Sequence, residues 1–439
     1  MRTAGHALPL AVAVALLAAA IPTGAAEAAP RPTATEIGVS ASELRIAVIA
    51  DVDNPAEPGL HQANVDAVRA FARSLNAHGG LAGRKVVVDF LDSHLSASDT
   101  QNEIIQACQH DFALVGTGAS FVNDTRPLVS CPDQRGQPTG LPDLSTFALD
   151  VGYACSPVSF QIAPSPLDCR TTGQSPQRYR VQVGPAQFFL RQHPGLHGQY
   201  VLSGDLASVR NAALPLVNGW TQAGVRADGD GTDFVSSLAP RSALTPIVQS
   251  LASHQSTFVY AGVPVSEVAA LRAEATLQGL RSVKVWTCPF SCYDRTLLGA
   301  GGADVDGELV TSTAVPFEEA GAVPALARYL RAVGPSKATG FGVQAWVAGL
   351  LLQRVVDTVT RGGGPNALTR SAFLAGLKAV RGFTADGILG ATDIGDRRPS
   401  DCFLVLAVRG GRFTRAYPSK VGTFDCRPTN TRTITLDLH

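Results

Sequence analysis

Three short apolar stretches, LRIAVIA (residues 44–50), KVVVDFL (85–91) and FALVG (112–116), decide the fold. Runs of this length are typical of parallel strands that are covered on both faces. Residues 60–76 lie between the first two stretches and carry apolar side chains at helical spacing, and residues 98–110 form a second expected helix. The order strand, helix, strand, helix, strand predicts a parallel sheet with right-handed crossovers, and therefore an α/β fold.

The loops that follow these strands are the first place to expect a binding site. Ligands of parallel sheets bind beyond the carboxyl ends of the strands. Asp51 and Asp53 follow the first strand, and Gly118, Ala119 and Ser120 follow the third. We expect these loops to lie side by side and to contact a ligand.

Residues 1–29 have the pattern of a secretory signal peptide. Arg2 gives a positive start, residues 8–21 are apolar and rich in alanine, and small residues surround Glu27. The alternative, a membrane helix, needs about 20 apolar residues, and this run is shorter. The first cysteine of the chain is Cys108, so the cleavage site offers no cysteine for a lipid anchor. We therefore expect an exported protein, extracellular or in the cell envelope, that does not span a membrane.

The charge balance excludes some partners. The sequence has 36 Lys and Arg against 36 Asp and Glu, so no overall field favours nucleic acid or an anionic membrane. The low charged fraction of 16% and the abundant glycine and proline fit an α/β protein with many tight loops.

The cysteines predict disulfide bonds. Their number, eight, is even, and the chain is expected to be exported. Pairing each cysteine with its nearest neighbour gives Cys108–Cys131, Cys155–Cys169, Cys288–Cys292 and Cys402–Cys426, although other pairings stay open. Zinc is the alternative, but no CxxC pair or histidine cluster supports it. We expect neither a metal nor a cofactor.

The strand–helix rhythm occurs a second time between residues 198 and 313, which predicts two similar lobes. Within this part, Trp286, Phe290 and Tyr293 surround Cys288 and Cys292. Aromatic side chains at a strand end, next to a tight disulfide, can form an apolar pocket wall.

Motifs of enzymes are absent from the sequence. It contains no GxSxG elbow, no HExxH and no GxxxxGK[ST] phosphate loop, and its nine histidines are scattered. His61, His78 and His94 lie near expected strand ends, where loop or surface histidines are the more common case. We expect a protein that is not an enzyme, with a secreted hydrolase as the least favoured alternative.

Five stretches together resemble the type I periplasmic solute-binding proteins, and within them the Leu/Ile/Val-binding-protein-like receptors of ABC transporters. The first lobe of that family is matched by ELRIAVIA (43–50), LNAHGGLAGRKVVVDFLDS (75–93) and FALVGTGAS (112–120). FVYAGVPVSEVAALRAEATLQGL (258–280) resembles the strand and helix of the second lobe, and GFGVQAWVAGLLLQRV (340–355) a late first-lobe helix. The resemblance covers nearly the whole mature chain in the right order.

The resemblance implies two Rossmann-like α/β lobes, each with a parallel sheet, joined by a hinge that the chain crosses three times. The expected divisions of the chain are a signal peptide (1–29), an N-terminal tail (30–43), lobe 1 (44–163 and 314–385), lobe 2 (164–313 and 386–426) and a frayed C-terminal tail (427–439).

The resemblance also implies ligand contacts. Ser120 matches the position where the family's first-lobe serine binds an amino-acid carboxylate, and Ser145 and Thr146 lie near a second contact. Tyr260 lies in the second-lobe strand that would face the ligand. Two positions depart from the family: Pro264 stands where amino-acid binders have an aromatic residue, and Phe290 where they have the acid for the ammonium group.

The function implied is capture of a small molecule, an amino acid or a related carboxylate or amide, and its delivery to the permease subunits of an ABC transporter. The protein would act as a monomer. Asp51 or Asp53 could replace the missing acid from the opposite lobe, since an unpaired buried ammonium costs several kcal/mol. The alternative from another class is a secreted sensor that reports the ligand to a membrane signalling partner.

Overall fold

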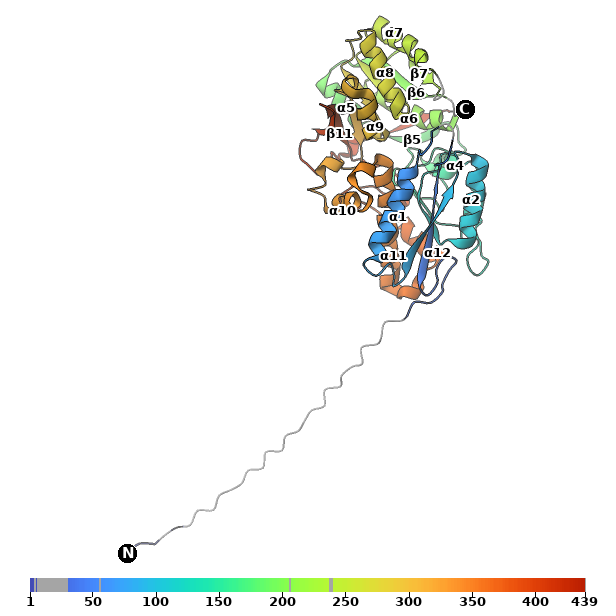
Figure 1. The fold of residues 1–439 in the computed structure, drawn as a ribbon, viewed down its shortest axis with the longest axis vertical. Coiled ribbons are helices and arrows are strands. Elements are labelled where there is room, and N and C mark those ends of the chain that lie inside the picture. The colour runs from blue at the N-terminus through green and yellow to red at the C-terminus, as the bar shows by residue number, and fades with distance from the viewer. Residues whose placement is uncertain (4, 6–30, 55–56, 205–206, 237–239, 439) are drawn as a thin grey trace.

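The computed structural model describes residues 1–3, 5, 31–54, 57–204, 207–236 and 240–438, and for residues 207–211 the backbone alone. Figure 1 shows two lobes, with α1, α2, α11 and α12 in one and α5 to α9 in the other. The predicted signal peptide, 1–29, falls almost entirely outside the described residues. Within the part of the chain that the structure describes, no helix has both the length and the apolar character needed to cross a membrane.

The sheet of the first lobe is parallel, as predicted, with the strand order β2-β1-β3-β4. Its strands are β1 (Glu43–Ala50), β2 (Lys85–Asp92), β3 (Ala113–Thr117) and β4 (Asp143–Ser145). In the register of the sheet, Ile46 of β1 pairs with Val88 of β2 and with Ala113 of β3. The carboxyl ends of these strands therefore meet at one edge of the sheet.

Helices lie on both faces of this sheet (Figure 1). The helices of the first lobe are α1 (Gln62–Asn76), α2 (Ala97–His110), α3 (Arg126–Val129), α4 (Val151–Ala154), α10 (Pro324–Val333), α11 (Gly340–Gly363) and α12 (Arg370–Lys378). α1 and α11 pack closely, because a glycine at Gly349 leaves room for the ring of Phe71: a Cβ at Gly349 would lie 2.5 Å from that ring. The Thr339 side chain accepts the Gly342 N–H and so fixes where α11 begins.

The sheet of the second lobe is mixed, with the order β12-β11-β10-β9-β8-β6-β7. β11 pairs antiparallel with both β10 and β12, and the other neighbouring strands are parallel. The strands are β6 (His197–Ser203), β7 (Arg226–Val235), β8 (Phe258–Gly262), β9 (Val285–Cys288), β10 (Leu309–Ser312), β11 (Leu404–Arg409) and β12 (Arg412–Tyr417). β11 and β12 form a hairpin that turns at Gly410 and Gly411, both of which have positive φ.

The helices of this lobe are α5 (Gly184–Gln192), α6 (Ala207–Ala223), α7 (Thr245–Ser253), α8 (Val265–Leu277) and α9 (Arg295–Gly301). Both lobes thus have the α/β architecture that the sequence predicts. In each, the loops after the parallel strands point toward the other lobe (Figure 1).

The buried apolar side chains form one cluster in the first lobe and two in the second. The first-lobe cluster includes Ile388, Leu389 and Ile394, which the sequence analysis assigned to the second lobe from residue 386 onward. We therefore propose that the third crossing between the lobes follows Ile394, while the first two lie near 163 and 314.

The N-terminal tail expected over residues 30–43 is in fact docked on the first lobe. Val39 is 2% exposed and belongs to the core of that lobe. Arg84, which is fully buried, donates hydrogen bonds to the carbonyl oxygens of Thr33 at 2.9 Å and Ser40 at 2.7 Å.

The C-terminal segment expected to be frayed (427–439) contains a strand within its described residues. β13 (Thr431–Leu436) pairs antiparallel with β5 (Gln177–Gln182) in a separate two-stranded sheet. Asn430, which is fully buried, donates to the carbonyl oxygens of Asp401 and Asp425 at 3.0 and 2.9 Å. Sequence alone did not reveal this pairing, because the partner strand lies about 250 positions earlier in the chain and the segment itself has few apolar residues.

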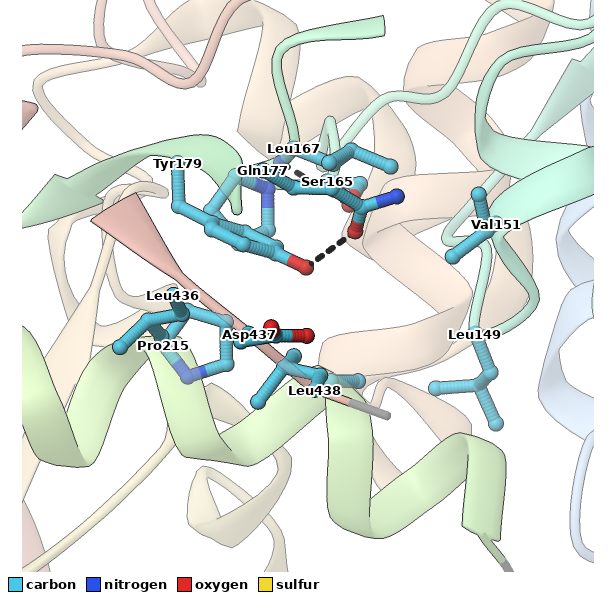
Figure 2. A pocket seen from close by; sticks show the side chains of 12 residues that line it. Leu149, Val151, Ser165, Leu167, Gln177, Tyr179, Pro215, Leu436, Asp437 and Leu438 are labelled. Carbon is cyan, nitrogen blue, oxygen red and sulfur yellow. Dashed lines mark hydrogen bonds between the residues drawn. The ribbon is translucent and has the colours of Figure 1, made fainter. Parts of the chain in front are cut away.

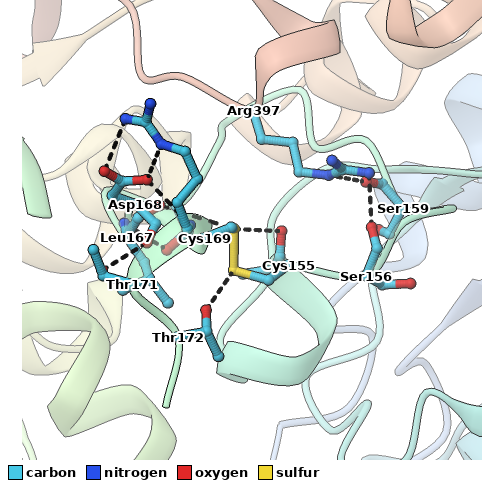
Figure 3. The surroundings of a disulfide bond; sticks show 12 residues. Cys155, Ser156, Ser159, Leu167, Asp168, Cys169, Thr171, Thr172 and Arg397 are labelled. Carbon is cyan, nitrogen blue, oxygen red and sulfur yellow. Dashed lines mark hydrogen bonds and ion pairs between the residues drawn. A yellow bond between two sulfur atoms is a disulfide. The ribbon is translucent and has the colours of Figure 1, made fainter. Parts of the chain in front are cut away.

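All four predicted disulfides are present: Cys108–Cys131, Cys155–Cys169, Cys288–Cys292 and Cys402–Cys426. Figure 3 shows that Cys155–Cys169 ties the end of α4 to the first crossing between the lobes. Beside it, Arg397 donates hydrogen bonds to the carbonyl oxygens of Ser156 at 2.7 Å and Ser159 at 2.9 Å (Figure 3). The crossing region is therefore braced by a covalent bond and by an arginine.

Candidate functional site

A cavity of about 720 Å³ lies between the two lobes, and we call it the interlobe cavity. Its lining residues come from both lobes and follow the carboxyl ends of strands, where ligands of parallel sheets bind. The first lobe contributes Glu57, Leu60, His61, Ser120, Phe147, Leu149 and Phe341. The second contributes Ala212, Ala213, Leu216, Tyr260, Gly262, Val263, Pro264, Val265, Ser266, Pro289, Ser291, Asp294 and Thr296.

Three rings form the centre of the first-lobe wall. The ring of His61 lies 4.9 Å from that of Phe341, edge to face, and 5.4 Å from that of Phe147, between centroids. His61 precedes α1, Phe147 follows β4, and Phe341 lies in the first turn of α11. Three separate elements thus hold a cluster of rings, and such a surface suits an apolar ligand.

Asp51 lies beneath this wall and does not line the cavity. It is fully buried, and its carboxylate accepts hydrogen bonds from Ser93 Oγ at 2.6 Å, from Leu95 N–H at 3.2 Å and from Ser120 N–H at 2.8 Å. His61 Nδ1 lies 3.5 Å from Asp51 Oδ2. Burial alone would raise the pKa of Asp51, but contacts with His61, Ser93 and Ser120 outweigh it and lower that pKa. Asp51 therefore holds the β1, β2 and β3 loops together as an ionised anchor.

This arrangement changes the role expected for Ser120. Its backbone N–H, a donor that a ligand carboxylate could have used, is bound to Asp51. Its side chain lines the cavity, so the hydroxyl is the group that can face a ligand.

Asp53 and two loop residues do not reach the cavity. Asp53 is exposed, and its N–H donates to Asp92 Oδ2 at 3.0 Å. Gly118 and Ala119 are buried behind the wall. Gly118 has no room for a side chain, since a Cβ there would lie 2.6 Å from Asn64 Nδ2 and 3.1 Å from His61. These residues shape the loop rather than contact a ligand.

Ser145 and Thr146 are also fully buried and do not line the cavity. Thr146 Oγ1 donates to the Thr117 carbonyl oxygen at 2.8 Å, and Asn64 Nδ2 lies 3.4 Å from Thr146 Oγ1. Ser145 Oγ lies 3.5 Å from Ser159 Oγ. The pair belongs to the polar network under the wall, and its successor Phe147 is the residue that faces the cavity.

The second-lobe wall is built mainly from turns. Residues 262–266 follow β8, and the segment from Pro289 to Thr296 follows β9, where Cys288–Cys292 closes a tight loop. Tyr260 lines the cavity, and its ring lies 5.4 Å from that of Trp220. Burial raises the pKa of Tyr260, so its hydroxyl stays protonated.

Phe290 does not line the cavity, although its neighbours Pro289 and Ser291 do. Its side chain packs against the cores of both lobes and stacks on Tyr293 at 5.9 Å between ring centroids. It acts as a contact between the lobes at the edge of the site.

Two carboxylates line the cavity that were not expected there from the sequence. Glu57 lies on the first-lobe side, in the loop after β1. Although the residue is exposed, surrounding atoms crowd its carboxylate, and this partial burial raises its pKa while His61 acts to lower it. Asp294 lies on the second-lobe side and accepts the Thr296 N–H at 2.7 Å, which caps α9.

A smaller pocket of about 180 Å³ adjoins the cavity and shares Leu149 and Ala212 with it. Figure 2 shows that Leu436, Asp437 and Leu438, at the end of the C-terminal strand, line one side of this pocket. The Tyr179 hydroxyl donates to Gln177 Oε1 at 2.7 Å above them (Figure 2). The C-terminal strand therefore reaches the space between the lobes.

The ring cluster also went unrecognised in the sequence. The sequence places His61 near an expected strand end and Phe341 in the stretch 340–355 that resembles a late first-lobe helix, which does not bring the two together. The signal that could have found both is position: each lies at the terminus of a helix that points to the carboxyl edge of the first sheet.

Known structures share this fold. An ABC transporter substrate-binding protein from Aeropyrum pernix superposes with a TM-score of 0.68 at 14% identity, over 88% of this chain and 97% of that one. A leucine-binding protein from Thermotoga maritima superposes with a TM-score of 0.64 at 15% identity, over 85% of this chain and 97% of that one. A putative branched-chain amino acid ABC transporter protein from Rhodospirillum rubrum superposes with a TM-score of 0.60 at 16% identity, over 85% of this chain and 99% of that one.

A comparison with curated proteins gives no match. The family model for periplasmic binding proteins, by contrast, matches residues 43–412, which is most of the chain. That family consists of binding proteins and not of enzymes, in agreement with the lack of catalytic motifs in the sequence. Two α/β lobes around a shared cavity, together with this match, confirm the resemblance drawn from the sequence: the chain belongs to the periplasmic binding protein family.

Proposed function

We propose that this protein captures a small organic molecule in the interlobe cavity and delivers it to the permease subunits of an ABC transporter. The observation that carries the proposal is the origin of the lining residues, because each lobe supplies one wall. A ligand that touches both walls stabilises the closed arrangement of the lobes by the contacts that it makes only there.

The composition of the walls supports a ligand with a substantial apolar body. Leu60, Phe147, Phe341, Leu216 and Val263 all line the cavity. Its volume, about 720 Å³, lies within the roughly 300–1,000 Å³ range of pockets that hold drug-sized molecules. Among the solved structures of this fold are a leucine-binding protein and a putative branched-chain amino acid transporter protein. An amino acid, or a related carboxylate or amide, is therefore the first ligand class to test.

The proposal places the protein outside the cytoplasm. The four disulfides are typical of proteins that fold in an oxidising compartment. They support the export that the sequence of residues 1–29 predicts.

A thermal-shift screen followed by titration calorimetry tests this function. The purified protein is screened against amino acids, amides, amines and aromatic and aliphatic carboxylates. A ligand of the folded state should stabilise it by about 2.7 kcal/mol at a hundred times its Kd.

A cavity variant and a matched control complete the test. Phe341→Ala should weaken the binding of the best compound at least tenfold, whereas Leu277→Ala should not, because Leu277 is 81% exposed on the far surface of α8 and outside the cavity. Equal affinities in the two variants, or no stabilisation by any compound of the screen, would contradict the proposal.

A further inference from the structure

We propose that the interlobe cavity selects organic cations: an amine or quaternary ammonium group attached to an apolar body. This inference rests on the proposed function, because it names the ligand class of the same cavity. It also departs from the carboxylate-containing ligands that the sequence analysis expected.

The first support is the charge of the walls. Among the described residues that line the cavity, Glu57 and Asp294 are carboxylates, and none is a lysine or an arginine. The two acids come from opposite lobes. A cation bound in the cavity would therefore have a carboxylate available on each wall, and charge-assisted hydrogen bonds are about twice as strong as neutral ones.

Both carboxylates have oxygens free for a ligand. Asp294 uses Oδ1 for the Thr296 N–H, and no hydrogen bond to its Oδ2 is made within the described residues. The Glu57 carboxylate likewise accepts none from that part of the chain. Only the Glu57 backbone is engaged, with its N–H bound to Asn54 Oδ1 at 2.7 Å.

The second support is the loss of an anion site. Ser120 N–H, the backbone donor next to the cavity, is bound to the buried carboxylate of Asp51 at 2.8 Å. Asp51 itself adds negative charge directly beneath the first-lobe wall. A ligand carboxylate placed against this wall would lie near the negative charge of Asp51 and could not use the Ser120 N–H as a donor.

The third support is the ring cluster of His61, Phe147 and Phe341. The phenyl rings of Phe147 and Phe341 can attract an ammonium group through the ring quadrupole. His61 is 2% exposed and lines the cavity, and its Nδ1 lies 3.5 Å from Asp51 Oδ2, so the imidazole joins the ring cluster to the carboxylate beneath the wall. Rings on one side and carboxylates on both walls together form a surface suited to an ammonium group.

A matched ligand series tests the inference. Phenethylamine, 2-phenylethanol, L-phenylalanine and hydrocinnamate share a phenyl body and differ in the charge at its other end. Titration calorimetry at pH 7 should give phenethylamine a Kd at least tenfold lower than that of hydrocinnamate, with phenylalanine between them. A lower Kd for hydrocinnamate or phenylalanine than for phenethylamine would overturn the inference.

Conservative variants identify the residues. Glu57→Gln and Asp294→Asn should each weaken phenethylamine binding about fivefold and leave 2-phenylethanol unchanged. Asparagine can still cap α9, so the second variant keeps the local fold. Asp53→Asn is the control, because this exposed acid belongs to the same loop as Glu57 but lies outside the cavity.

The outcomes separate this inference from the proposed function. If hydrocinnamate or phenylalanine binds most tightly and Phe341→Ala abolishes that binding, capture in the cavity stands and cation selectivity fails. If no member of the series binds, or if Glu57→Gln and Asp294→Asn bind phenethylamine as the unaltered protein does, cation selectivity likewise fails.

Discussion

The two walls of the interlobe cavity are held in place by different means. The first-lobe wall rests on a buried polar network, in which Asp51 joins the loops of three strands. The second-lobe wall combines a face of α6 with the segments that follow β8 and β9, the latter closed by Cys288–Cys292. A network of hydrogen bonds fixes the ring cluster in one geometry, whereas turns offer backbone and small side chains that can adapt. We infer that the first lobe sets which ligand is chosen and that the second lobe completes its enclosure.

Buried carboxylates show the same contrast. In the first lobe, hydrogen bonds outweigh burial and lower the pKa of Asp51. In the second, burial of Glu308 outweighs its 2.9 Å contact with Arg272 and raises its pKa to about 7. The two carboxyl groups should therefore change the free energy of unfolding in opposite directions with pH. Asp51 stabilises the folded protein at neutral pH, and this contribution is lost as pH falls below 3.8 through its lowered pKa. Glu308 contributes stability at low pH, and this contribution is lost as pH rises above 4.5 through about 7.

The largest expected effect is that of Asp51→Ala. It leaves the Ser93 hydroxyl and two backbone N–H groups without their acceptor in a buried site, so the free energy of unfolding should fall by about 4 kcal/mol. Urea denaturation measures it. Asp53→Ala is the matched control and should change that free energy by less than about 0.5 kcal/mol, because the side chain is exposed. Similar losses in the two variants would refute the anchoring role of Asp51.

The second prediction concerns Glu308→Gln. The carboxyl of Glu308 should lower the free energy of unfolding of the unaltered protein by about 3 kcal/mol as pH rises from 4.5 to 8. The reason is that its pKa is about 7 in the folded protein and 4.5 in the unfolded chain. The glutamine variant lacks this component, so its stability relative to the unaltered protein should rise by that amount over the same interval. Denaturation curves at pH 4.5, 6 and 8 measure the difference; a constant difference across them would show that Glu308 does not titrate in this range.

A smaller effect is expected from removing the disulfide under the second-lobe wall. Cys288→Ser with Cys292→Ser should lower the free energy of unfolding by about 2 kcal/mol, since the closed loop is short. Cys155→Ser with Cys169→Ser, which opens a longer loop, should cost about 3 kcal/mol but leave the cavity walls unchanged. The affinity for the best ligand distinguishes the two double variants, because only Cys288→Ser with Cys292→Ser should weaken binding.

The smallest predicted change is that of Ser120→Ala. The backbone N–H of Ser120 keeps its bond to Asp51, so stability should hold, while loss of the hydroxyl should weaken ligand binding about fivefold. Ser42→Ala, at an exposed position before β1, serves as the control. Titration calorimetry decides the matter, and an unchanged affinity would remove Ser120 from the site.

The fold could be predicted because its signals are local. Apolar runs such as 44–50 and the helical pattern of 60–76 fix strand and helix without knowledge of the rest of the chain. The C-terminal strand could not, since Ile434 finds its place only against β5, far away in the sequence.

The site was harder to predict for the same reason. Ser120 and Tyr260 were expected near the ligand and line the cavity. Asp51 and Asp53, two positions apart, look alike in the sequence, yet one is buried under Ser93 and Ser120 and the other is exposed. Which acid faces a ligand depends on loops that arrive from other strands, and single-sequence patterns carry no information on that.

The measurement that tests capture between the lobes most directly is hydrogen exchange with and without the compound of lowest Kd from the screen. Our account predicts slower amide exchange at both walls at once, in residues 118–120 and 146–149 of the first lobe and 262–266 and 289–296 of the second. Protection confined to one lobe, or found only away from the cavity, would contradict it.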